Sequence, residues 1–351
     1  MKKFVAMLLA VVLMGALAAG CGQTPAEETA LPSPEATAAE NTAESETTPE
    51  PQKLKIVTTI FPEYDWVREI LGDKAENAEV TMLLDNGVDL HSYQPTADDI
   101  VKISDCDLFI YVGGESDGWV EDALKNAVNK DMKVINLLEV LGDSVKTEEV
   151  VEGMQETEHD HDEGEEHEHE HEEEKDEHVW LSLKNAEVLV NAISNSLQEL
   201  DPDNKDAYAA NSEAYVKKLA ALDADYQAAV DAAAYKTVLF GDRFPFRYLV
   251  DDYGLSYYAA FVGCSAETEA SFETISFLAK KVDELKLPCV LTIEGAQHKI
   301  AETIVQNTAE KNQKILTMDS MQSTTSEDVA NGTTYLSVME KNLSVLKEAL
   351  G

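Results

Sequence analysis

The chain is poor in basic residues. It holds 27 Lys and Arg against 68 Asp and Glu, which gives a formal net charge of -41 over 351 residues. A surface this acidic repels the phosphate groups of nucleic acids and of anionic lipids, so we expect no nucleic-acid partner. It favours cationic partners instead.

Cysteine is also scarce, with four residues in the whole chain. Cys106 precedes an apolar segment, and we expect it to be buried. Cys264 and Cys289 both fall in the second half of the chain, where an extracytoplasmic setting would allow a disulfide. Sequence alone does not fix the geometry that such a bond needs, so the pairing stays open.

The apolar run Phe4–Leu17 is too short to serve well as a membrane-spanning helix. It follows Lys2 and Lys3 and ends in small residues before Cys21, a pattern that resembles a bacterial lipoprotein signal. We predict cleavage after residue 20, a lipid on the Cys21 thiol, and an extracytoplasmic location anchored to the bacterial cell membrane. A plain secretory signal is the alternative. Residues 21–52 hold too few large apolar side chains to fold and would form a disordered tether.

Residues 201–234 contain no glycine, and their only proline is Pro202. Asp201 fits a helix cap, and Pro202 fits the first helical position. Apolar side chains recur at three, four or seven residues and form one stripe: Tyr208, Tyr215, Leu219, Leu222, Tyr226, Ala229 and Ala233. We predict one rigid helix of about 30 residues, roughly 45 Å long, that links two lobes.

Apolar segments alternate with helical patterns on both sides of this helix. Four predicted strands fall in residues 53–200, near 54–60, 78–84, 107–112 and 133–136, and four in residues 235–351, near 237–240, 256–261, 289–293 and 314–318. Such alternation predicts parallel sheets with helices on both faces. The fold class is therefore α/β with two parallel-sheet lobes, and the cleft between the lobes is the expected ligand site.

Ligands of open α/β sheets bind at the carboxyl ends of the strands. The loops there carry His91 and His178 in the first lobe and Asp242 and Asp319 in the second. Two imidazoles and two carboxylates suit a four-coordinate Zn2+ and can also hold Mn2+. Each residue has a plainer interpretation: the histidines as surface loop residues, and the aspartates as caps of a helix or a turn.

Two motifs surround the candidate histidines: Asp89–Pro95 reads Asp-Leu-His-Ser-Tyr-Gln-Pro, and His178–Leu181 reads His-Val-Trp-Leu. They resemble the Asp-Pro-His-x-Tyr-Glu-Pro and His-x-Trp-Leu motifs of the zinc/manganese substrate-binding lipoproteins of bacterial ABC transporters. Asp201–Lys205 resembles the start of the family's linking helix. Leu316–Asp319 resembles the strand end that carries its last carboxylate ligand. The resemblance covers nearly everything from Lys53 to Leu350.

The resemblance implies a monomeric binding protein, not an enzyme, that captures Zn2+ in the interlobe cleft and delivers it to an ABC-type permease. A manganese-specific protein of the same family is one alternative. A metal-dependent hydrolase, or a metal-storage or adhesin lipoprotein, is an alternative from another class. A hydrolase needs an open coordination position, a general base and a substrate pocket. The binding-protein interpretation accounts for the signal, tether, lobes and cleft together.

The third ligand departs from the family pattern. The family usually has His or Glu before an aromatic-Gly-Tyr segment, and alignment on Tyr248 places that position at Arg243. Arginine cannot bind a metal cation. Either the neighbouring Asp242 is a ligand or a water fills the position. Glu267 and Glu294 are weaker alternatives.

The first lobe also contains an acidic loop, about 143–177, whose later part is rich in histidine. It offers no large apolar residue from Glu158 to Glu177, so we predict a mobile segment. Imidazoles spaced two residues apart can chelate a metal without a fold, which makes the loop a candidate low-affinity collector that favours zinc over manganese. An inert insert is the alternative. The loop histidines are His159, His161, His167, His169 and His171.

Overall fold

The structure is a computed structural model that describes residues 53–155, 174–265, 269–295 and 298–351. Several predictions lie outside these residues: the signal sequence, the tether, the lipidation of Cys21, the ligand role of Glu267, and the metal-collecting role of His159, His161, His167, His169 and His171. Those predictions stay predictions.

The sheet of the first lobe has four parallel strands. They are β1 Leu54–Thr58, β2 Ala78–Met82, β3 Leu108–Tyr111 and β4 Lys133–Asn136, in the order β2-β1-β3-β4. Leu108, Phe109 and Ile110 of the inner strand β3 are fully buried. Side chains on both faces of the strand are covered, as the predicted parallel sheet requires.

Helices cover this sheet and shape the loops at its carboxyl end. The α-helices are α1 Phe61–Leu71, α2 Ala97–Asp105, α3 Val120–Lys125, α4 Leu137–Leu141 and α5 Leu183–Leu200. Short 3-10 turns are η1 Gly72–Asn77, η2 Leu90–Ser92, η3 Gly142–Ser144 and η4 Val179–Leu181. Two of these turns, η2 and η4, adjoin the two histidines that the sequence singled out.

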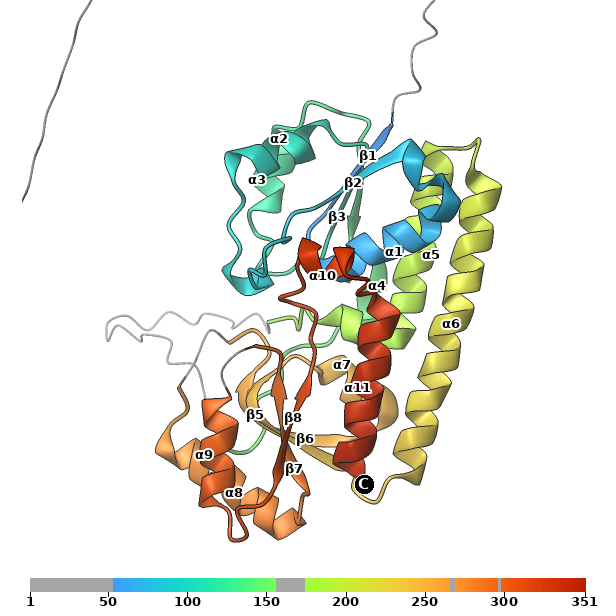
Figure 1. Cartoon of the computed structure of the whole chain (residues 1–351). Coiled ribbons are helices and arrows are strands. Elements are labelled where there is room, and N and C mark those ends of the chain that lie inside the picture. The colour runs from blue at the N-terminus through green and yellow to red at the C-terminus, as the bar shows by residue number, and fades with distance from the viewer. Residues whose placement is uncertain (1–52, 156–173, 266–268, 296–297) are drawn as a thin grey trace, which may run out of the picture. The chain divides into compact units, whose positions relative to one another are not determined.

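The second lobe repeats the strand order of the first. Its strands are β5 Thr237–Phe244, β6 Ser256–Val262, β7 Cys289–Ile293 and β8 Lys314–Met318, all parallel and ordered β6-β5-β7-β8. Its helices are α7 Arg247–Tyr253, α8 Phe272–Leu285, α9 Lys299–Asn307, α10 Ser326–Ala330 and α11 Tyr335–Leu350. Figure 1 shows the two sheets with their helices. Both predicted parallel sheets of four strands are present.

The linking helix α6, Lys205–Ala232, starts later than predicted. The Asp201 amide donates to the Leu197 carbonyl and ends α5, and the Asp201 carboxylate accepts hydrogen bonds from Asn204 and Tyr208. Asp201 therefore closes the turn between α5 and α6 and does not cap the linking helix. The large side chains of the predicted stripe, Tyr208, Tyr215, Leu219, Leu222 and Tyr226, are buried, whereas Ala229 and Ala233 are half-buried. The helix packs on α1 and α5 of the first lobe and on α7 and α11 of the second (Figure 1).

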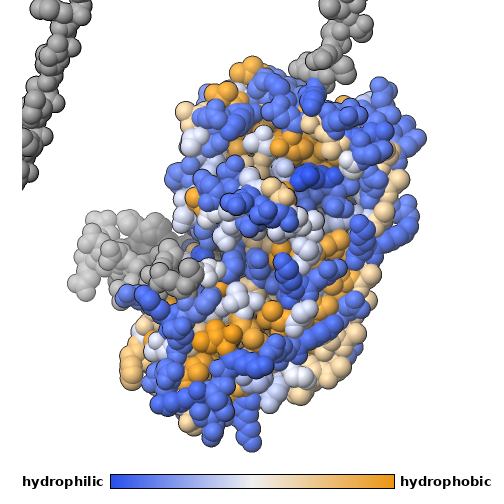
Figure 2. Space-filling view, in the orientation of Figure 1, coloured by the Kyte–Doolittle hydropathy of each residue, from blue (hydrophilic) through white to orange (hydrophobic). Residues whose placement is uncertain are grey.

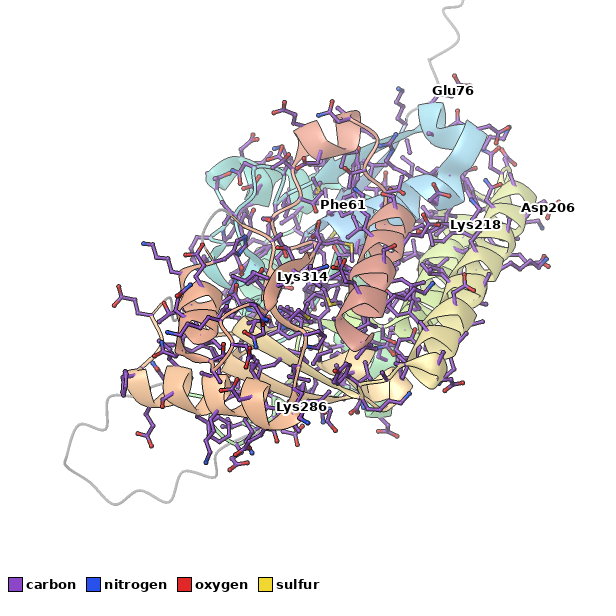
Figure 3. All side chains as sticks on the ribbon, turned by 60° about the horizontal axis from the view of Figure 1, so that its bottom comes forward. Phe61, Glu76, Asp206, Lys218, Lys286 and Lys314 are labelled. Atoms are coloured by element: carbon purple, nitrogen blue, oxygen red, sulfur yellow. The ribbon has the colours of Figure 1, made fainter. Side chains whose placement is uncertain are left out.

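The larger of two apolar cores runs through both lobes, the smaller lies within the second lobe, and all described residues belong to a single compact unit. Buried hydrogen bonds join the lobes: the Tyr335 amide donates to Asp65 of α1 and its hydroxyl donates to the Trp180 carbonyl at 2.6 Å. Phe61 lies inside this core at the start of α1, whereas Asp206 projects from α6 into solvent (Figure 3).

On the face drawn in Figure 2, hydrophilic residues cover most of the area, with smaller hydrophobic patches between them. Within the described residues, no helix combines the length and the apolar character that a membrane crossing needs.

Candidate metal centre

His91 sits in η2, in the loop that follows β2. The Asp89 carboxylate accepts a hydrogen bond from the His91 amide at 3.0 Å and fixes this turn. The ring nitrogen Nδ1 lies 2.8 Å from the Ser116 hydroxyl and 3.4 Å from a Glu177 oxygen. The side chain is 9% exposed, so its other nitrogen, Nε2, faces the interior of the site.

His178 is fully buried at the start of η4. Its amide and its Nδ1 both lie 2.9 Å from the same oxygen of Asp176. Burial opposes protonation of the ring, but the nearby carboxylates of Asp176, Glu177 and Glu148 outweigh it and raise the pKa of His178 above its usual value. The imidazole is therefore held in one orientation by a carboxylate behind it.

The two imidazoles face each other through their Nε2 atoms, which are 3.1 Å apart. Each Nδ1 is turned toward a carboxylate, Glu177 for His91 and Asp176 for His178. That is the arrangement in which metal-binding histidines are held, with the outer nitrogen donating and the inner lone pair free. Two nitrogen ligands of a tetrahedral Zn2+ lie about 3.3 Å apart, given Zn–N bonds of about 2.0–2.1 Å. The histidine pair already has this spacing.

Cys264 completes a cluster with this pair. The ligand atoms of His91, His178 and Cys264 all lie within 4.8 Å of one another. Burial raises the pKa of the Cys264 thiol far above its usual value, and the carboxylates of Glu148 and Asp176 raise it further. The sequence motifs did not indicate Cys264 as a ligand, although it follows β6 and so occupies a strand end like the two aspartates.

The three cysteines in the described residues are free. Cys264 lies just past the carboxyl end of β6, whereas Cys289 begins β7 in the same parallel sheet. Cys264 therefore lies at the carboxyl end of the parallel strands and Cys289 at their amino end. The disulfide considered from the sequence does not form. Cys106 is fully buried, as expected.

Asp242 is not part of the cluster in the described residues. The sequence placed it after the end of a strand, but β5 continues to Phe244 with a bulge between Phe240 and Arg243. One Asp242 oxygen accepts from the Arg243 amide at 2.9 Å and the other from the Ile293 amide at 3.4 Å. The carboxylate is thus engaged by backbone donors.

Asp319 follows β8 as predicted, but the structure does not bring it into the cluster either. Its carboxylate accepts from the Met321 amide at 2.8 Å and closes a turn. Burial, with the nearby Glu294 carboxylate, raises the pKa of Asp319 to about 6. Glu294 itself accepts from the amides of Ser320 and Gln322 and from the Ser320 hydroxyl.

Arg243 occupies the position where the motif comparison placed a ligand. Its guanidinium donates to Asp89 of the first lobe at 2.7 Å and to the Ser265 carbonyl at 3.3 Å. Burial alone would raise the pKa of Asp89, but Arg243 holds it below its usual value. The Gln322 amide also lies within hydrogen-bond distance of Asp89 and of His178 Nε2. Polar residues of the second lobe thus close over the histidine pair.

A pocket of about 290 Å3 opens beside the cluster. It is lined by His91, Glu115, Ser116, Glu174, Lys175, Glu177 and Cys264. Three glutamates against one lysine give the pocket a negative potential, which attracts cations toward His91 and Cys264. The pocket therefore places negative charge directly beside the cluster.

Residues 114–118, Gly-Glu-Ser-Asp-Gly, match the Gly-x-Ser-x-Gly pattern of serine hydrolases, and Ser116 contacts His91. A catalytic triad needs its serine and its carboxylate on opposite nitrogens of the histidine. Here Ser116 and Glu177 both approach Nδ1 of His91. Ser116 and Glu177 therefore orient the His91 ring as they would orient a metal ligand, and the three residues do not form a catalytic triad. A formal His-Glu-x-x-His match, residues 167–171, lies outside the described residues.

Comparisons of the sequence with known proteins agree on one family. The family described as "Zinc-uptake complex component A periplasmic" matches residues 56–349. The zinc-binding lipoprotein AdcA of Streptococcus pneumoniae (strain TIGR4) is 35% identical over 296 residues, which cover 84% of this chain and 56% of AdcA. The high-affinity zinc uptake system protein ZnuA of Bacillus subtilis is 33% identical over 298 residues, covering 85% and 88%. This chain thus spans little more than half the length of AdcA.

Solved structures share the two-lobed fold. The Zn(II)-bound ZnuA-like domain of S. pneumoniae AdcA matches with a TM-score of 0.64 and 31% identity, over 85% of this chain and 99% of that domain. The metal-dependent lipoprotein YcdH from B. subtilis matches with a TM-score of 0.67 and 28% identity, over 85% and 99%. The predicted fold class is confirmed.

Proposed function

The chain belongs to the family of the zinc-uptake complex component A, and from this premise we propose that it captures Zn2+ between its lobes and delivers it to an ABC-type permease for import. The observation that carries the proposal is the histidine pair. His91 and His178 present two Nε2 atoms 3.1 Å apart, each backed by a buried carboxylate. The pair is a preformed binding site for one metal cation that accepts imidazole ligands.

The buried carboxylates near the histidine pair favour a divalent cation at this site. Asp176 and Glu177 are each 3% exposed at the side chain and lie behind the two rings. Their charges sit in a poorly screened environment, so they attract a cation more strongly than surface carboxylates do. A bound cation would neutralise the negative charge that the metal-free site concentrates.

Zinc suits the described ligands better than manganese, which is the alternative within the family. Imidazole nitrogen is a preferred ligand of Zn2+, whereas Mn2+ favours carboxylate, carbonyl and water oxygens and binds more weakly in the general affinity order. The second-lobe carboxylates of Asp242 and Asp319, which would serve Mn2+, accept backbone hydrogen bonds instead. One oxygen of Asp319 is held by the Met321 amide, and the structure does not bring this carboxylate into the cluster.

The remaining parts of the proposal concern location and assembly. We propose a lipid anchor on Cys21, a tether over 21–52, and extracytoplasmic lobes over 53–200 and 235–351 joined by the linking helix. The mature protein would act as a monomer that presents its loaded cleft to the permease. The name of AdcA, a zinc-binding lipoprotein, supports this arrangement.

Competition titration against a zinc chelator of known affinity tests the proposal, because it isolates the tight site from weak sites on other histidines. His91→Ala and His178→Ala should each weaken tight binding by about 100-fold or more, beyond the 10- to 100-fold typical of lost supporting residues. His298→Ala is the matched control, because His298 precedes α9 and is outside the cluster. Zinc binding of parental strength in both cleft variants would overturn the proposal.

A further inference from the structure

Among the His, Cys, Asp and Glu side chains of the described residues, the second lobe contributes one to the histidine pair, Cys264, through its sulfur. We propose that the Cys264 thiolate is the second-lobe ligand of the metal. With His91 and His178 it forms a His2Cys site that binds thiophilic cations such as Zn2+ and not Mn2+. This inference rests on the proposed function, and it names the class of cation that the site takes.

The spacing of the three groups is close to that of such a site. Zn–S bonds of about 2.3 Å and Zn–N bonds of about 2.0–2.1 Å place sulfur and nitrogen ligands about 3.6 Å apart. The ligand atoms of His91, His178 and Cys264 lie within 4.8 Å of one another without a metal. A movement of roughly 1 Å in side chains would therefore complete three bonds.

The backbone before Cys264 is fitted to the His178 ring. A Cβ atom added at Gly263 would lie 2.9 Å from Cε1 and 3.0 Å from Nδ1 of His178. Only glycine allows the chain to pass this close to the imidazole. The close approach fixes Cys264 relative to the histidine of the opposite lobe.

A segment of the first lobe holds Cys264 from its other side. The Glu148 carboxylate accepts from the Cys264 amide at 2.9 Å, and the Gln155 amide donates to the Ala260 carbonyl of β6 at 2.9 Å. The residues from Glu148 to Gln155 thus lie along the end of β6. Cys264 is anchored between this segment and His178.

Arg243 explains why the ligand comes from β6 and not from β5. Arg243 pairs with Phe261 in the sheet, so Cys264 lies three residues beyond the level of Arg243 on the neighbouring strand. The guanidinium is committed to Asp89 and to the Ser265 carbonyl next to Cys264. Arg243, at the position where a ligand was expected, therefore holds the loop after β6 by hydrogen bonds. Cys264 in that loop supplies the sulfur ligand instead.

A thiolate changes which cations the site accepts. Soft sulfur ligands favour Zn2+ and softer ions, whereas Mn2+ gains little from them. The Glu148 carboxylate, which accepts from the Cys264 amide, and the Glu177 carboxylate beside His91 add negative charge that attracts a cation to this position. Three protein ligands also leave one position for a water or an incoming group.

The test compares Cys264→Ser with Cys289→Ser, each in the full chain carrying Cys21→Ser. Cys289 is the matched control because it is free and buried at the amino end of the parallel strands. Cys264→Ser should lower zinc affinity by about 100-fold, leave weak Mn2+ binding unchanged, and remove the thiolate-to-metal charge-transfer absorption of the Co2+-loaded protein. Cys289→Ser should keep all three properties.

A second measurement needs no substitution at Cys264. One equivalent of Zn2+ should slow alkylation of Cys264 by iodoacetamide at least tenfold, with the modified residue located by mass spectrometry. An unchanged alkylation rate, or a Cys264→Ser variant with parental zinc affinity and cobalt spectrum, would overturn the cysteine ligand. Zinc capture by the histidine pair would still stand if His91→Ala and His178→Ala lost affinity. A parent protein without tight zinc binding would overturn both.

Discussion

The two sheets have the same strand order, yet their strand-end loops hold different kinds of side chain in different ways. In the first lobe, carboxylates support imidazoles: Asp176 and Glu177 contact the outer nitrogens of His178 and His91. In the second lobe, the carboxylates of Asp242 and Asp319 accept hydrogen bonds from backbone amides. A carboxylate at a strand end is a good backbone cap, whereas an imidazole is not. Histidine at such a position is therefore the stronger sign of a ligand.

The largest expected effect separates the two lobes directly. His178→Ala should weaken tight zinc binding by about 100-fold or more, whereas Asp242→Asn and Asp319→Asn should each cost less than tenfold, because those carboxylates are engaged by the backbone. Competition titration of the three variants side by side gives the ranking. A larger loss for Asp319→Asn than for His178→Ala would reverse the comparison and make Asp319 the principal ligand.

The pH dependence sharpens the role of the first lobe. Zinc binds the neutral ring, so protons compete with it. Because neighbouring carboxylates raise the pKa of His178, this competition should begin above about pH 6.5, the usual imidazole value, and grow as the pH falls. Asp176→Asn should move the onset to lower pH. Titration at half-unit steps from pH 8 to pH 5 measures the onset, and an identical onset in both proteins would contradict the assigned cause.

The carboxylate behind His178 should matter less than the ring itself. Asp176→Asn should lower zinc affinity at pH 8 by about 10- to 100-fold, since the amide holds the ring less firmly and adds no charge. Asp252→Asn is a suitable control, because Asp252 is a partly buried carboxylate that accepts from Ser182 and is outside the cluster. Equal losses in the two variants would indicate a general effect of charge or folding.

Most of the fold could be predicted from the sequence because its strands are continuous apolar runs and its long helices carry clear periodicity. The predicted bounds of β7 and β8, 289–293 and 314–318, agree with the structure to the residue. The five-residue helices α4 and α10 were missed, because helices this short depend on caps and neighbours more than on their own pattern. Asp201 was misassigned because a helix cap and a closing turn use the same side chain.

The candidate site was predicted in part for a similar reason. His91 and His178 belong to recognisable motifs that fix the loops around them, and the structure brings them together. The place of Cys264 beside the histidine pair depends on the close approach of Gly263 to His178. That approach joins distant parts of the chain, which a local pattern does not contain.

The Arg243–Asp89 ion pair links the two lobes. Its loss should lower the free energy of unfolding and affect zinc binding less than the changes above. The two side chains are 19% and 23% exposed, so the bond is only partly screened. Arg243→Ala should destabilise the fold by roughly 1.5–3 kcal/mol, the range for hydrogen bonds to charged groups. Lys125→Ala, which removes an exposed pair with Glu121, should cost less than about 1 kcal/mol. Urea unfolding of the metal-free proteins measures both. Equal costs would mean that the interlobe pair contributes no more than a surface pair.

The smallest effect on the tight site is expected from the histidine-rich loop. Deleting residues 158–173 removes His159, His161, His167, His169 and His171 but keeps Glu174, whose carbonyl accepts from the Glu148 amide at the base of the loop. The cluster of His91, His178 and Cys264 is built from other residues, so tight binding should change by less than about threefold. Weak additional zinc equivalents should disappear, and uptake should slow only when zinc is scarce.

Calorimetric titration of the parent and the deletion variant decides between the roles of the loop. Because the weak sites need neutral imidazoles, they should also vanish in the parent at mildly acidic pH. Equal stoichiometry in the two proteins at neutral pH would make the loop an inert insert. Loss of the tight site in the deletion variant would place its ligands within the loop and would break the contrast between the lobes, because neither set of strand ends would then hold the metal.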